Sequence, residues 1–264
     1  MGDFAELQVW RDLSTASALS WYLDVAENRQ PAKFRIAATV PVAVSLEDAS
    51  EEALWRELDR LTPAFLERWR RIRDEGAQLD GRADPNLLDL CRTLAWRMLA
   101  HCNFCRWNCR VDRTRGARFG ACKLGAVTRV STYFHHPGEE LVYRGVAGSG
   151  TIFFTSCNMR CAFCQNGDIS TDKDNGAVTD ARTLATMAWL LRAEGCHNVN
   201  WVGGEVTIHL HTIVEAIALL GKGFLPNRAD LTAALPTKLT VWNDRSAPDG
   251  TSRHPHRFRA PATT

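Results

Sequence analysis

The sequence predicts an α/β protein: a partial (β/α) barrel, with a helical N-terminal region and a cysteine-rich insert before it. Strand and helix patterns alternate over residues 148–220, which is typical of a parallel sheet or barrel. Helical periodicity dominates residues 1–100, and seven of the nine cysteines fall between residues 102 and 164. We therefore divide the chain into a helical region (1–100), a cysteine-rich metal-binding segment (101–130), the partial barrel (148–220) and a tail (221–264).

Three helices are expected before the cysteines. Ser50 can cap the first of them, and Thr62-Pro63 is a second start signal, because proline is favoured in the first turn of a helix. Apolar residues at steps of three and four between Leu87 and Leu99 predict the third helix. Cys91 lies on that apolar stripe, so we assign it to the core.

Two strand–helix units make up the predicted barrel. Residues 151–155 (TIFFT) are β-branched and aromatic, which favours a buried strand, and residues 198–202 form a second strand candidate. Apolar periodicity predicts helices over residues 179–194 and 207–220.

The pattern stops at Gly221. The last 44 residues hold five of the ten prolines and no third strand–helix unit, so we expect a disordered or aberrant tail. A complete (β/α)₈ barrel takes about 250 residues. We therefore expect the barrel to be truncated, or its end to be frame-shifted.

Composition narrows the function classes. The 264 residues are 45% hydrophobic and 23% charged. The net charge of +2 is too small to favour binding to nucleic acid or to a membrane surface. Nine cysteines are far fewer than a disulfide-stapled secreted scaffold carries. No signal peptide or membrane-spanning stretch is visible, which predicts a cytoplasmic protein without a membrane partner.

The first cysteine motif lies directly after a predicted strand. Residues 156–167 (SCNMRCAFCQNG) contain Cys157, Cys161 and Cys164 in the spacing Cys-x₃-Cys-x₂-Cys. Three thiolates can bind an iron–sulfur cluster and leave one iron open, since such a cluster normally takes four cysteines. The alternative is a zinc site, for which His197 or His209 could supply a fourth ligand.

This motif, with Phe163 before its last cysteine, resembles the signature of radical S-adenosylmethionine (SAM) enzymes. The wider string GSGTIFFTSCNMRCAFCQNGDIS is similar to the branch around pyruvate formate-lyase activating enzyme, as is the upstream Gly138-Glu139-Glu140. The resemblance covers roughly residues 101–220.

The resemblance implies a [4Fe–4S] cluster on Cys157, Cys161 and Cys164, with SAM chelating the fourth iron. One electron would cleave SAM to a 5′-deoxyadenosyl radical, which abstracts hydrogen from the substrate. Phe163 would lie near the adenine. Gly203, Gly204 and Glu205 match the family's GGE motif, which approaches the amino group of SAM, although Val206 replaces the usual proline.

A second cysteine set precedes the barrel. Cys102, Cys105, Cys109 and Cys122 can complete the coordination of a structural zinc ion or a second iron–sulfur cluster. Residues 102–129 also carry seven basic side chains against one acid, and neighbouring cations lower the pKa of a thiol. That basic surface could contact RNA or an acidic protein.

The leading hypothesis is a radical SAM oxidoreductase similar to glycyl-radical activases. The resemblance implies a glycyl-radical-type protein or a small molecule as substrate, and an electron donor such as flavodoxin or ferredoxin. One alternative is a cysteine-rich iron–sulfur or zinc module that binds nucleic acid, a partner that the leading hypothesis does not require. A further alternative is an inactive, truncated member of the family.

Overall fold

A four-stranded mixed sheet forms the centre of the computed structural model, which describes residues 11–239. The strand order is β3-β1-β2-β4, with β1 spanning Arg129–His136, β2 Ser149–Phe154, β3 Ala177–Val178 and β4 Val199–Gly203. β2 and β4 are parallel, whereas β1 is antiparallel to both β2 and β3. The predicted α/β class and the two predicted strands are confirmed, and the architecture is compatible with part of a barrel.

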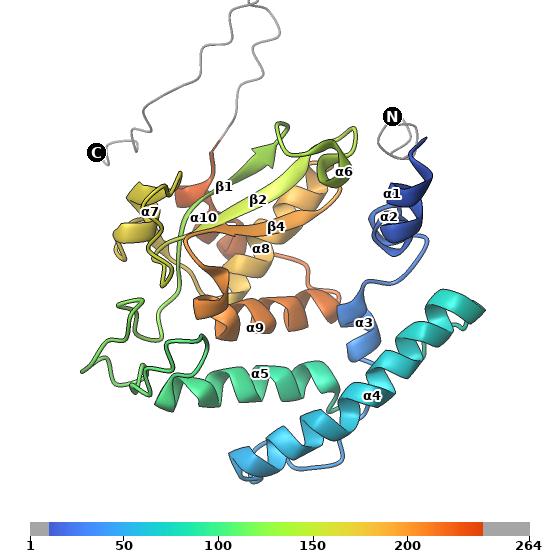
Figure 1. Ribbon diagram of the computed structural model, residues 1–264, viewed down its shortest axis with the longest axis horizontal. Helices are drawn as coiled ribbons and strands as arrows, with labels where there is room; N and C mark the ends of the chain where they lie inside the picture. Colours follow the sequence, from blue (N-terminus) through green and yellow to red (C-terminus); the bar gives the residue numbers. More distant parts are fainter. Residues whose placement is uncertain (1–10, 240–264) are drawn as a thin grey trace, which may run out of the picture.

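Helices cover the sheet in successive layers (Figure 1). α8 (Ala181–Ala193) connects the two parallel strands and packs on the sheet through its buried face, which includes Leu184 and Leu191. α9 (Leu210–Gly221) packs between α8 and α5 (Leu87–Arg97), and α4 (Glu51–Glu75) packs on the far side of α5. Both predicted barrel helices are therefore confirmed, and they join the N-terminal helices to the sheet.

Shorter elements complete the described part of the chain. They are α1 (Leu13–Ala18), α2 (Ser20–Ala26), α3 (Lys33–Ala37), α6 (Leu141–Arg144), α7 (Gly167–Thr171), α10 (Arg228–Ala234) and the 3₁₀ helices η3 (Met98–His101), η4 (Val206–His209) and η5 (Leu235–Thr237).

The expected helix boundary at Thr62-Pro63 is wrong, because α4 runs through it without a break. Pro63 cannot donate a hydrogen bond to the carbonyl of Asp59, but both residues are exposed, so water can bond that carbonyl. Ser50 caps the helix as predicted, accepting a hydrogen bond from Ala53 N at 3.2 Å. Cys91 packs against the core between α4 and α5, also as predicted.

Part of the expected tail after Gly221 is regular structure, because residues 228–234 form the helix α10. α10 packs on α8, where Arg182 contacts Asp230 through two hydrogen bonds of 2.5 and 2.7 Å. Asp230 also completes a capping box with Asn227 at the start of α10. A short helix with a capping box and an ion pair needs no strand beside it, which is why the strand–helix pattern missed it. The rest of the predicted tail, from residue 240, lies outside the described residues.

None of the helices over residues 11–239 is both long and apolar enough to cross a membrane.

Candidate metal and cofactor site

The three cysteines of the first motif line one cleft at the end of the parallel strands. Cys157, Cys161 and Cys164 lie on the loop between β2 and α7 and open into a cleft of about 410 Å³. Gly204, which follows β4, lines the same cleft. Cys161 and Cys164 are exposed and Cys157 is half-buried. The sequence places these residues on separate strand ends, and the parallel pairing of β2 with β4 brings them together.

Hydrogen bonds orient two of the three sulfurs. The backbone N–H of Met159 donates to Cys157 Sγ at 3.2 Å, and Cys164 Sγ lies 3.4 Å from the hydroxyl of Ser170. Ser156 begins the loop in a left-handed conformation (φ 67°), and its N–H donates to Ile169 O at 2.8 Å. The loop therefore folds back on the start of α7 with its thiols outward.

Gly203 and Gly204 are required by the close approach of β4 to this loop. A Cβ on Gly204 would lie 1.7 Å from the carbonyl oxygen of Ser156, and Gly203 has a φ of 111°. Backbone N–H groups of Gly204 and Glu205 donate to Phe154 O and Ser156 O, at 3.0 and 3.1 Å. Packing within the protein therefore explains glycine at both positions. The contact of these glycines with SAM stays a prediction.

Glu205 and Phe163 have different surroundings. The carboxylate of Glu205 accepts a hydrogen bond from Thr207 N at 2.9 Å and caps η4. Phe163 is 87% exposed, so its large aromatic ring packs little against the described residues. The stretch Gly138-Glu139-Glu140 lies in the connection before β2, at the opposite end of the strand from the cysteines. There Glu139 accepts a hydrogen bond from Asn200 at 3.1 Å.

The three thiols that line the cleft fit a multi-iron cluster. Among the described residues, no three cysteine, histidine or acidic side chains converge closely enough to hold one metal ion. A cluster does not need such convergence, because each of its irons takes its own thiolate. The free thiols of Cys157, Cys161 and Cys164 would each bind one iron at the mouth of the cleft.

Neither histidine considered for a zinc site supports that alternative. His209 is fully buried, with its ring nitrogens 2.9 Å from Thr155 O and 3.2 Å from Thr128 Oγ1. Burial lowers the pKa of His209 to about 3. His197 precedes β4, so it lies at the other end of that strand from Gly203.

The second cysteine set is partly buried. Cys102 and Cys122 are buried, whereas Cys105 and Cys109 are half-buried, and all four are free thiols. Burial raises the pKa of the Cys122 thiol, and the nearby sulfurs of Cys102 and Cys105 add to that rise. Arg113 lowers the pKa of Cys122, as expected of a neighbouring cation, but burial has the larger effect and the pKa of the thiol rises.

The two cysteine segments form one continuous region, since Cys122 also lines the cleft of the first motif. Three hydrogen bonds connect them: Ser156 Oγ donates to Cys122 O at 2.5 Å, Arg160 to Ala121 O at 2.8 Å, and Trp107 to Asn158 O at 2.9 Å. Figure 1 shows the loops after α5 on the same side of the molecule as the loop near α7. The donors Ser156, Arg160 and Trp107 carried no sequence signal for this contact.

The predicted basic surface is smaller than the sequence suggests. Arg113 is buried, and Arg129 is half-buried beside Asp174, with a shortest N–O distance of 3.9 Å. The other basic residues of this stretch are exposed, together with Trp107 and Phe119; they are Arg106, Arg110, Arg115, Arg118 and Lys123.

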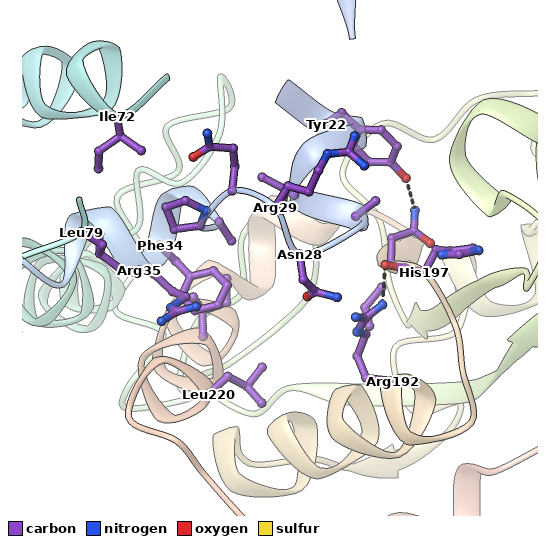
Figure 2. A pocket seen from close by; sticks show the side chains of 18 of the residues that line it. Tyr22, Asn28, Arg29, Phe34, Arg35, Ile72, Leu79, Arg192, His197 and Leu220 are labelled. Atoms are coloured by element: carbon purple, nitrogen blue, oxygen red, sulfur yellow. Dashed lines mark hydrogen bonds between the residues drawn. The ribbon is translucent and has the colours of Figure 1, made fainter. Parts of the chain in front are cut away.

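A larger cavity, of about 820 Å³, lies away from the cysteines (Figure 2). It is bounded by α2, α3 and the end of α4 on one side, and by α8, α9 and the start of β4 on the other. Asn198 donates to Tyr22 Oη across it at 3.0 Å. None of its described lining residues is a cysteine, so it is separate from the candidate metal site.

Comparison with known proteins identifies the domain. Residues 151–241 match the radical SAM superfamily, a stretch that begins within β2 and contains the cysteine loop and the glycine pair. The chain is 33% identical over 211 residues to an uncharacterized protein of Methanocaldococcus jannaschii, an alignment that covers 77% of this chain. The chain spans 58% of that relative's length, and no solved structure matches. The radical SAM domain implies a [4Fe–4S] cluster, SAM binding and SAM cleavage chemistry.

Proposed function

We propose that this protein is a radical SAM enzyme that cleaves SAM reductively and abstracts a hydrogen atom from its substrate. Cys157, Cys161 and Cys164 would hold a [4Fe–4S] cluster, which would supply the electron that cleaves the carbon–sulfur bond of SAM to methionine and a 5′-deoxyadenosyl radical. The observation that carries the proposal is the shared cleft: Cys157, Cys161 and Cys164 open beside Gly204, within the matched domain.

The residues of the chain would bind the cluster and SAM and orient them. Each of the three thiols would bind one iron, and the N–H of Met159 and the hydroxyl of Ser170 contact two of the sulfurs. Gly204 lines the cleft at the end of β4, so a ligand bound there can contact this part of the backbone. The exposed ring of Phe163 can stack on the adenine of SAM.

The proposed substrate is a partner protein of the glycyl-radical type, as in activases. The cleft is open to a large molecule, because Cys161 and Cys164 are exposed and Met159 beside them is 57% exposed. A small acidic redox protein such as flavodoxin or ferredoxin would supply the electron. The exposed basic residues near the cleft, with Lys123 in its lining, support this choice of donor through charge complementarity.

The test is release of 5′-deoxyadenosine by anaerobically reconstituted protein supplied with SAM and dithionite. We expect product from the wild type and none from Cys161→Ala. Cys91→Ala is the matched control, because its thiol packs against the helical core and lies outside both cysteine segments. Absence of product from the wild type with a bound iron–sulfur cluster contradicts the proposal.

The alternative function, nucleic-acid binding, has one observation in its favour. Trp107 and Phe119 are exposed among basic side chains, and such a combination binds single strands through base stacking and phosphate contacts. Salt-dependent binding of single-stranded RNA, lost in Trp107→Ala, would support it. Binding that is absent at low salt excludes it.

A further inference from the structure

Arg113 is a buried cation without an anionic partner among the described residues. Its side chain is 1% exposed, and no carboxylate of residues 11–239 forms an ion pair with it. Nε donates to Gly125 O at 3.0 Å and Nη1 donates to Ile208 O at 2.9 Å, whereas Nη2 has no hydrogen-bond partner. A buried charge in this state is costly unless something negative compensates it.

Cysteines are the neighbours that can become negative. Cys102 Sγ lies 4.0 Å from Nη1 of Arg113. Cys122 packs with Ile208, whose carbonyl accepts the hydrogen bond from Arg113. Cys109 belongs to the same neighbourhood, because its sulfur accepts a hydrogen bond from Ala121 N at 3.4 Å, one residue before Cys122. Phe104 covers the guanidinium on a further side, with its ring centroid 5.4 Å away.

Neutral thiols cannot balance Arg113, but metal binding removes their protons. A metal ligand must be a thiolate, so binding converts the thiols into anions. Four thiolates outweigh the two positive charges of a zinc ion, and the centre keeps a net negative charge. A [4Fe–4S] core on four thiolates is likewise negative.

We propose that Cys102, Cys105, Cys109 and Cys122 hold a metal–thiolate centre for which Arg113 is the buried counter-ion. The described thiols do not converge on one point. In the proposed centre, the half-buried Cys105 and Cys109 would approach the buried Cys102 and Cys122. The proposed centre uses none of the three motif cysteines as ligands, so its metal content can be measured without SAM cleavage.

The centre would position the first cysteine loop. The hydrogen bonds from Ser156, Arg160 and Trp107 all join that loop to the segment that the four cysteines would fix. Ordering residues 102–122 around a metal therefore also fixes the wall of the cleft that Cys122 lines.

The test uses the full chain with Cys157, Cys161 and Cys164 replaced by alanine, so that the first site cannot bind metal. We expect about one zinc ion after zinc loading, or about four irons with matching sulfide after anaerobic reconstitution, per chain. The two loadings decide between zinc and a cluster. Metal content at background level after both would overturn the proposed centre.

Arg113 is then tested in the same background. We expect Arg113→Met to weaken metal affinity about 10- to 100-fold in chelator competition, the range seen when outer-shell partners are removed. Arg115→Met is the matched control, because that side chain is exposed, and it should leave affinity unchanged. Arg113→Lys, which keeps the charge, should restore most of the affinity.

Circular dichroism of Arg113→Met distinguishes weaker metal binding from misfolding. Parental affinity in a folded Arg113→Met variant would overturn the counter-ion role. If Arg113→Met does not fold, Arg113→Lys decides: affinity near that of the parent supports the role of the charge, and affinity reduced 10-fold or more contradicts it.

Discussion

Replacing Gly204 with alanine places a methyl group where the backbone leaves no room for one. The new Cβ would lie 1.7 Å from the carbonyl oxygen of Ser156 and 2.6 Å from its carbonyl carbon. Both are backbone atoms, so no side-chain rotation relieves the clash. The end of β4 must therefore move away from the loop that carries Cys157.

The expected cost follows from two terms. Inserting a methyl group into packed surroundings costs about 1–3 kcal/mol. Separation also weakens the backbone hydrogen bonds from Gly204 to Phe154 and from Glu205 to Ser156, each worth about 1 kcal/mol. Together these give a loss of roughly 2–5 kcal/mol, or very roughly 4–20 °C in Tm at about 2–4 °C per kcal/mol.

The assay is thermal unfolding of metal-stripped protein, followed by circular dichroism. Gly167→Ala is the matched control, because Gly167 begins α7 nearby and a Cβ there meets no atom within 4 Å. We expect its Tm to stay unchanged or to rise slightly, since alanine at an open position costs the unfolded chain entropy. Equal Tm values for the two variants would refute the close approach of β4 to the loop.

Three further predictions concern separate parts of the molecule. Pro63→Ala should raise Tm, because the new N–H can bond the Asp59 carbonyl within α4, a gain of up to about 3 kcal/mol; an unchanged Tm would contradict the continuous helix. Burial lowers the pKa of His209 to about 3 against 6.5 in the unfolded chain, so the unfolded state takes up a proton as pH falls below 6.5. The free energy of unfolding should then fall by about 1.4 kcal/mol for each pH unit below 6.5 because of this ring. In denaturant titrations at several pH values, His209→Gln should remove that part of the pH dependence. The same pH dependence in wild type and variant would contradict the burial of His209. Phe163→Ala should leave Tm unchanged, because the ring is 87% exposed, yet reduce 5′-deoxyadenosine release; a large fall in Tm would show that the ring packs in the fold.

Local patterns predicted the elements that carry the candidate site. The run before Cys157 is β-branched and aromatic, and the apolar spacing of α8 and α9 is helical, so these elements follow from nearby residues alone. β1 was missed because its strand character depends on pairing with β2, where Phe134 stacks on Phe153 with ring centroids 5.6 Å apart. Pro63 misled because an exposed proline can be tolerated inside a long helix.

The contact between the two cysteine segments could not be predicted from the sequence. It depends on single side chains of Ser156, Arg160 and Trp107 that reach backbone carbonyls about 35–50 residues away in the sequence, and such contacts leave no periodic signal. The interior position of Arg113 was equally hidden, since nothing in a run of basic residues distinguishes the one that folds inward.

The electron paramagnetic resonance spectrum of the reduced protein, with and without SAM, tests the central claim most directly. Three cysteines leave one iron of the proposed cluster open to SAM. We therefore predict that SAM changes the spectrum of the wild type, and that Cys161→Ala shows no such change. A cluster spectrum in the wild type that is indifferent to SAM would contradict the account.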